Sequence, residues 1–161
     1  MTIKVGDKLP NATFRLATEE GAKPVSAEAF FGGRKIVLFG LPGAFTPTCQ
    51  NNHLPGFLAN EAAFKAKGVD EVAMTSVNDH YVLAAWAEAT GAKGHLAFLA
   101  DGAGAFARAA GLDFDATAGG LGVRSKRYSM LVEDGVVKRL NIEEAPGKVD
   151  LSGAAHLLAQ M

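Results

Sequence analysis

The 161-residue sequence contains a single cysteine, Cys49. One thiol excludes an intrachain disulfide, a two-cysteine redox pair and a zinc site built on cysteines. A lone, unpaired cysteine is typical of proteins kept in a reducing compartment, so we expect a cytoplasmic protein.

Long apolar runs and a strong charge of one sign are also missing. The longest apolar run, around Ile36, is far too short to span a bilayer. The net charge is −1, which gives no electrostatic reason to expect nucleic acid or an anionic membrane as a partner. The first seven residues show no apolar or Arg-rich targeting pattern, so we expect no targeting peptide.

The remaining composition is that of an ordinary soluble globular protein, with 48% hydrophobic and 20% charged residues. The length fits one domain with a full hydrophobic core. No internal repeat, low-complexity tract or linker interrupts the chain. We therefore expect residues 1–161 to form a single domain.

Strand and helix patterns alternate along the chain and predict an α/β fold, with a central mixed β-sheet flanked by helices. Strands are expected at 12–16 (an edge strand), 36–39, 69–77, 95–100, 127–132 and 136–142. Helices are expected at 26–31, 46–64, 79–91, 103–110 and 151–158. Pro55 should kink the second helix, and residues 113–123 are expected to form a loop. This order fits a thioredoxin-like arrangement.

The segment from Leu41 to Cys49 joins the most strand-like run to a helix start. Thr46 and Pro47 suit the N-cap and first helical positions. Cys49 then lies in the first turn, where free backbone N–H groups and the helix dipole favour a thiolate. The alternative is an unreactive buried side chain, but the position between a buried strand and a helix favours a reactive cysteine.

Pro42, Thr46 and Cys49 form the P-x-x-x-T-x-x-C motif of the peroxiredoxins, and residues 39–49 resemble the type II, or peroxiredoxin V, group. Further segments resemble that group at 4–7, 53–57, 76–79 and 126–130. The resemblance therefore covers nearly the whole chain. It implies a single thioredoxin-like peroxiredoxin domain that reduces hydrogen peroxide and alkyl hydroperoxides.

The resemblance also implies a role for four side chains. The Cys49 thiolate would attack a peroxide oxygen and become a sulfenic acid. Thr46 would hydrogen-bond the sulfur and the incoming peroxide, and Arg127 would hold the thiolate and the developing charge. Pro42 would shield the sulfenate from over-oxidation.

A low thiol pKa cannot by itself explain fast peroxide reduction. Lowering the pKa of a cysteine from ~8.5 to about 6 raises the thiolate fraction near neutral pH roughly 30-fold. The same change weakens the nucleophile about tenfold. Most of the acceleration must therefore come from groups that bind the transition state. The hydroxyl of Thr46, which can donate and accept, and the cationic guanidinium of Arg127, which has several donors, suit that task.

Two of these interpretations have rivals. Arg124 and Lys126 are alternatives to Arg127 as the active-site cation, and an arginine in a strand is by default a solvated side chain. The likeness at 126–130 selects Arg127, which strand alternation places on the same face as Ser129. His53 shares a helix face with Cys49 and could favour the thiolate if protonated, but anchoring the kink before Pro55 is the better interpretation.

No metal and no cofactor are expected. The remaining histidines, His80, His95 and His156, lack metal-ligand spacing. Residues 102–107 fit the dinucleotide pattern G-x-G-x-x-A, but no acidic residue that ends a strand follows ~20 positions later. We interpret that segment as the cap of an alanine-rich helix.

Many members of the resembled group have a second, resolving cysteine, which this chain lacks. An outside thiol must then reduce the sulfenate, and glutathione, glutaredoxin and thioredoxin remain open as the source. The resemblance also implies a homodimer with loops around the active site at the contact. The alternative function is a peroxide-sensing or chaperone-like interaction protein in which Cys49 oxidation alters assembly.

Overall fold

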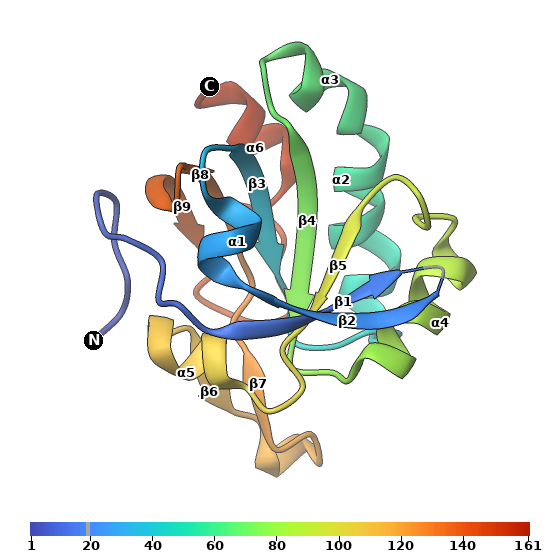
Figure 1. Cartoon of the computed structure of the whole chain (residues 1–161). Helices are drawn as coiled ribbons and strands as arrows, with labels where there is room; N and C mark the ends of the chain where they lie inside the picture. Colours follow the sequence, from blue (N-terminus) through green and yellow to red (C-terminus); the bar gives the residue numbers. More distant parts are fainter. Residues whose placement is uncertain (19) are drawn as a thin grey trace.

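The computed structural model describes residues 1–18 and 20–161. Its central sheet has seven strands in the order β2-β1-β5-β4-β3-β8-β9 (Figure 1). The inner strands β3, β4 and β5 are parallel, and the outer strands run antiparallel to their neighbours. This confirms the predicted mixed α/β sheet. The strand bounds are β1 Thr13–Thr18, β2 Gly21–Ser26, β3 Lys35–Gly40, β4 Glu71–Ser76, β5 Ala97–Ala100, β8 Tyr128–Glu133 and β9 Val136–Ile142.

Helices cover both faces of the sheet. On one face, α2 (Leu54–Ala59), α3 (Glu61–Ala66), α4 (His80–Thr90) and α6 (Ala154–Ala159) contribute side chains to a hydrophobic cluster that also contains Cys49. On the other face, α1 (Ala27–Phe31) and α5 (Ala105–Ala110) pack over a second cluster. Ser26 and Asp79 cap α1 and α4 as their sequence positions predict.

Two expectations about strands were wrong. The strand predicted at 12–16 is not at the edge, because β2 pairs with it and takes the edge position. Pro24 masked β2 in the sequence, although proline is tolerated in an edge strand. Residues 113–123 are not only a loop, since β6 (Asp113–Asp115) pairs with β7 (Val123–Ser125) around the short 3₁₀ turn η2 (Thr117–Gly119).

The helix predicted over 46–64 is interrupted twice. Residues 47–48 are α-helical, but η1 (Cys49–His53) is a π-helix in which the Leu54 N–H donates to the Cys49 carbonyl. The wide turn lies directly before Pro55, which has no N–H to continue the α-helical ladder. A second break at Asn60 separates α2 from α3.

The antiparallel pairing of β3 and β8 brings distant parts of the chain to one edge of the sheet. Gly40, the last residue of β3, lies opposite Tyr128, the first residue of β8. The loop that follows β3 therefore begins beside Arg127, which directly precedes β8. The parallel neighbour β4 ends at the same edge with Ser76.

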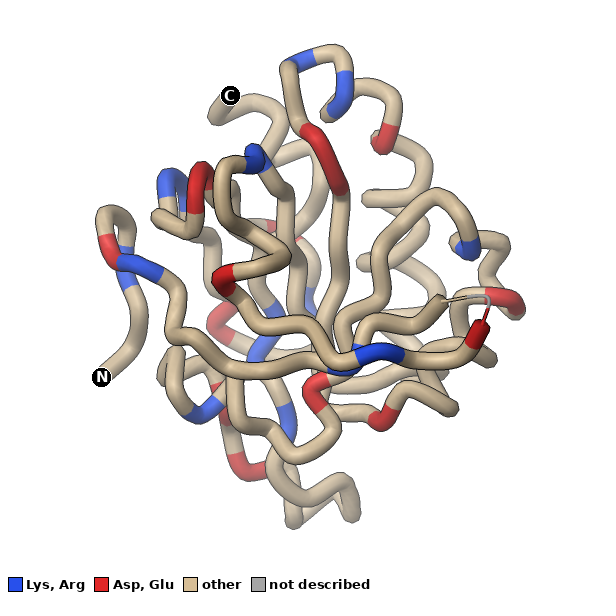
Figure 2. Tube along the Cα trace, in the orientation of Figure 1, with Lys and Arg blue, Asp and Glu red and all other residues tan. Residues whose placement is uncertain are grey.

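Acidic and basic residues are interspersed along the trace of the chain, and the described residues contain no long segment of one sign (Figure 2). This distribution agrees with the net charge of −1. Within residues 1–18 and 20–161, no helix is both long enough and apolar enough to cross a membrane.

Candidate active site

The loop between β3 and the first helical turn is fixed by the neighbouring strand β4. The Leu41 N–H donates to the Thr75 carbonyl at 3.3 Å. The Ala44 N–H donates to Oδ1 of Asn78 at 3.0 Å, and that oxygen also accepts from the Ser76 hydroxyl at 2.8 Å. Asn78 thus holds the loop from outside, a role that the sequence signalled only through the likeness at 76–79.

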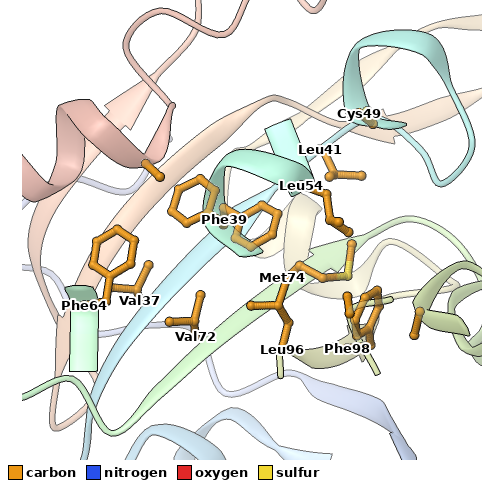
Figure 3. Packing of buried hydrophobic residues seen from close by; sticks show 14 of the residues in the cluster. Val37, Phe39, Leu41, Cys49, Leu54, Phe64, Val72, Met74, Leu96 and Phe98 are labelled. Carbon is orange, nitrogen blue, oxygen red and sulfur yellow. The ribbon is translucent and has the colours of Figure 1, made fainter. Parts of the chain in front are cut away.

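Cys49 lies at the end of this loop and has no solvent-exposed surface. Its side chain packs near Leu41 and Leu54 at the border of the larger hydrophobic cluster (Figure 3). The helical turns begin at Pro47, so Cys49 stands near the amino end of the helical segment, as predicted. A ligand of the sulfur must therefore be small or must wait for the site to open.

Arg127 reaches the sulfur from the start of β8. Its Nη2 donates to Cys49 Sγ at 3.1 Å, and its Nε donates to the Pro146 carbonyl at 2.9 Å. Nη1 lies 3.0 Å from Nδ1 of His53. Among the described residues, these contacts use three of the five guanidinium N–H groups, so two remain for another acceptor. The structure brings Arg127, and not Arg124 or Lys126, onto the sulfur.

His53 is buried, with 1% of its surface exposed, and contacts Arg127 on one side and the Ser152 carbonyl on the other. Burial and the neighbouring Arg127 charge lower the pKa of His53 from 6.5 to about 3. The imidazole is therefore neutral near pH 7. The hypothesis that a protonated His53 favours the thiolate is not supported by this environment.

Glu143 organises the segment that contacts His53. Its carboxylate accepts hydrogen bonds from the backbone N–H groups of Asp150, Leu151 and Ser152 and from the Ser152 hydroxyl. Partial burial raises the pKa of Glu143, but these hydrogen bonds outweigh it and the net shift is downward. Sequence reasoning missed Glu143 and Ser152, because both lie far along the chain from Cys49 and belong to no recognisable motif.

Pro42 and Thr46 line the loop beside Cys49. The Thr46 hydroxyl donates to the Gly43 carbonyl at 2.7 Å, which leaves its oxygen lone pairs as acceptors. Pro42 is buried, and its carbonyl accepts from Nη1 of Arg124 at 3.3 Å. Arg124 thus braces the loop but does not contact the sulfur in the described residues.

The dinucleotide-like segment is occupied by a side chain of the protein itself. The carboxylate of Asp101 accepts from the N–H groups of Phe106 and Ala107 at 3.0 and 2.9 Å. These are the donors that a phosphate would need at the start of α5. The segment is therefore a helix cap, as its sequence predicts.

Comparisons with known families, curated proteins and solved structures all identify the same family. The family model described as Redoxin matches residues 4–158. Peroxiredoxin-2C of Oryza sativa subsp. japonica is 44% identical over 157 residues, which make up 97% of this chain and 96% of the rice protein. The crystal structure of reduced Prx3 from Vibrio vulnificus in complex with hydrogen peroxide matches with a TM-score of 0.93 and 46% identity, over 99% of both chains. Peroxiredoxin 5 from Alvinella pompejana matches with a TM-score of 0.83 and 34% identity, over 98% of both chains.

Proposed function

Since the chain belongs to the Redoxin family and is a type II peroxiredoxin, a thiol-dependent peroxidase with a thioredoxin-like fold, we propose that Cys49 is its peroxidatic residue. The observation that carries this proposal is the 3.1 Å contact between Arg127 Nη2 and Cys49 Sγ in a buried site. Cys49 is also the only thiol that the chain offers.

The first chemical step is nucleophilic substitution at a peroxide oxygen. The Cys49 thiolate attacks the terminal, hydrogen-bearing oxygen of ROOH, the O–O bond breaks, and the leaving alkoxide takes up a proton from water to become ROH. The sulfur is oxidised to a sulfenic acid, and the peroxide is reduced to water or an alcohol. A buried site suits this step because charge interactions there are weakly screened.

Arg127 stabilises the charge that moves from sulfur to the peroxide oxygens. Its Nη2 already faces Sγ, and the two unused N–H groups can bind a peroxide oxygen as negative charge develops on it. An interaction that strengthens during O–O cleavage lowers the barrier, whereas one that only stabilises the thiolate does not.

Thr46 and Pro42 complete the site. Because the Thr46 hydroxyl proton is committed to the Gly43 carbonyl, its oxygen accepts a hydrogen bond from the peroxide O–H. This orients the attacked oxygen toward Cys49. Buried Pro42 limits access to the sulfur and so restricts further oxidation of the sulfenate.

The reductant is an external thiol, because the chain has no second cysteine. The sulfenic acid condenses with a thiol R′SH to give a mixed disulfide and water, and a second thiol releases Cys49 and R′SSR′. We favour glutathione over thioredoxin and glutaredoxin as the thiol that attacks the buried sulfenic acid, because both of the latter are folded proteins. Cys49 is fully buried, so a tripeptide needs a smaller opening than a folded protein does.

The protein is also proposed to act as a homodimer through the loops around the site. Phe45, Leu121 and Val123 expose 52%, 40% and 44% of their surface. The contact of Arg124 with the Pro42 carbonyl links the β7 region to the Phe45 loop. Phe45 also adopts a positive φ of 63°, a costly conformation for a bulky residue, and this conformation supports a functional role for its outward position.

Thiol-dependent peroxide consumption tests the proposed function. The protein should consume hydrogen peroxide with glutathione present, and Cys49→Ser should lower the rate to that of glutathione alone. Thr48→Ser, in the same helical turn, is the matched control and should retain activity. Unchanged turnover in Cys49→Ser would refute the assignment, and turnover only with thioredoxin would refute the preference for glutathione.

A further inference from the structure

The guanidinium of Arg127 is held by a chain of contacts that begins far from the sulfur. From the remote end, the contacts run from the Glu143 carboxylate to Ser152, from the Ser152 carbonyl to His53, and from His53 to Arg127. Resting on the proposed role of Cys49, we propose that neutral His53 is a positioning residue that holds Arg127 on the sulfur. The segment 143–152 fixes the orientation of His53.

The hydrogen-bond partners of His53 determine its tautomer. The Ser152 carbonyl can only accept, so Nε2, at 3.0 Å, must carry the imidazole proton. Nδ1 is then unprotonated and accepts from Nη1 of Arg127 at 3.0 Å. A protonated imidazole would instead point a second N–H at the guanidinium, and the two cations would repel. His53 can therefore hold Arg127 only in its neutral form.

Arg127 needs such a brace because its side chain is long. An arginine side chain has many rotamers, so a single contact does not define where its guanidinium lies. Here Pro146 fixes Nε and His53 fixes Nη1, which leaves Nη2 aimed at Sγ. The planar guanidinium transmits both restraints to the third nitrogen.

Glu143 hydrogen-bonds to both ends of this chain of contacts, at Arg127 and at Ser152. Its backbone N–H donates to the Arg127 carbonyl at 2.9 Å. Its carboxylate accepts from the Ser152 N–H at 2.9 Å and from the Ser152 hydroxyl at 2.6 Å. The same residue thus fixes the main chain of Arg127 and the carbonyl that orients His53.

A double-mutant cycle on the peroxide reaction tests this role. We compare the second-order rate constant of the wild type, His53→Phe, Arg127→Gln and the double variant with hydrogen peroxide. The phenylalanine ring keeps the packing against Phe39 and Phe57 but offers no acceptor. His53→Phe should slow the reaction roughly 10- to 100-fold, and Arg127→Gln about 100-fold or more.

The double variant decides between positioning and an independent structural effect. If His53 acts through Arg127, the double variant should be no slower than Arg127→Gln alone. Losses that multiply would overturn the proposal, as would an unchanged rate in His53→Phe. A wild type that does not react with peroxide would instead refute the proposed function, so the two failures are distinguishable.

Two further variants keep the test decisive if His53→Phe does not fold. His53→Gln retains an amide oxygen that can accept from Arg127 and an N–H that can donate to the Ser152 carbonyl, so it should react faster with peroxide than Arg127→Gln. Glu143→Gln, remote from the sulfur, should slow the peroxide reaction in the wild type but not in Arg127→Gln. The exposed neighbour Glu144→Gln is the matched control and should change neither rate. A Glu143→Gln rate equal to that of the control would contradict the coupling.

Discussion

Among residues 1–18 and 20–161, Arg127 is the one cation in contact with the Cys49 sulfur, and His53 beside it is neutral. Burial and the Arg127 charge keep the pKa of His53 near 3, well below its ordinary value of 6.5. The positive charge of the site is therefore concentrated on Arg127 and directed at Cys49 through Nη2. A protonated His53 would repel the Arg127 guanidinium and would break its own contact with it.

The neutral state of His53 predicts a loss of stability in acid. Below pH 6.5 the unfolded chain binds a proton at His53 that the folded chain does not bind. The free energy of unfolding should therefore fall as the pH decreases from 6.5 toward 3, by up to about 1.4 kcal/mol per pH unit. The lowered pKa of Glu143 acts in the same direction below its ordinary value of 4.5. Urea unfolding between pH 7 and pH 5 measures the slope of the unfolding free energy against pH. In this interval His53 contributes more to the slope than Glu143 does.

His53→Gln removes this titration and serves as the reference. Its free energy of unfolding should depend less steeply on pH than that of the wild type over this interval. Parallel curves for the two proteins would show that His53 does not stay neutral in the folded state.

At the scale of elements, the site depends on the antiparallel contact between β3 and β8. Tyr128 lies opposite Gly40, and its ring covers the place where a side chain of residue 40 would be. The tyrosine hydroxyl would lie 2.8 Å from a Cβ at Gly40. The absence of a side chain at Gly40 thus lets the start of β8, with Arg127, approach the loop of Cys49.

Gly40→Ala should therefore damage both stability and activity. An added methyl group would overlap the buried Tyr128 ring and cost roughly 1–3 kcal/mol of unfolding free energy. Displacement of β8 would also move Arg127 away from Sγ and slow the peroxide reaction. Gly119→Ala, where nothing lies within 4 Å of the added atom, is the matched control. Thermal unfolding of the two variants measures the first effect, and equal melting temperatures would contradict it.

Local patterns predicted the elements that carry strong local signals. The buried strand before the Cys49 loop, the Asp79-capped helix α4 and the Asp134-Gly135 turn follow from hydrophobic runs, capping residues and turn chemistry. The edge strand β2 and the π-helix η1 were not predicted. β2 forms through pairing with β1, and η1 reflects the packing of a proline-containing helix, so neither has a clear periodic pattern of its own.

The sequence predicted only part of the site, because several of its contacts join residues that are far apart in the chain. Thr46 and Cys49 lie in one segment, so the local strand-to-helix pattern marks them. The contact of Arg127 with Cys49 spans 78 positions and follows from the strand order. Glu143 and Ser152 act through backbone atoms and through His53, which are contacts that residue types alone do not announce.

At the scale of the whole molecule, the three layers leave the site at one edge of the sheet, close to exposed apolar side chains. The dimer proposal predicts that Phe45→Glu weakens self-association, because it places a charge in the proposed contact. Sedimentation velocity should show the wild type as a dimer and Phe45→Glu shifted toward monomer. Val5→Glu, another exposed apolar position at 56% exposure, is the control and should stay dimeric. A monomeric wild type would contradict the proposal.

In the proposed reaction, the buried Cys49 thiolate, faced by Arg127, reduces peroxide directly. Mass spectrometry of the intact protein after one equivalent of hydrogen peroxide tests it most directly. We predict one added oxygen atom, located on Cys49 by peptide mapping and replaced by a glutathione mixed disulfide when glutathione follows. An unmodified Cys49, or oxygen found only on methionine, would contradict the account.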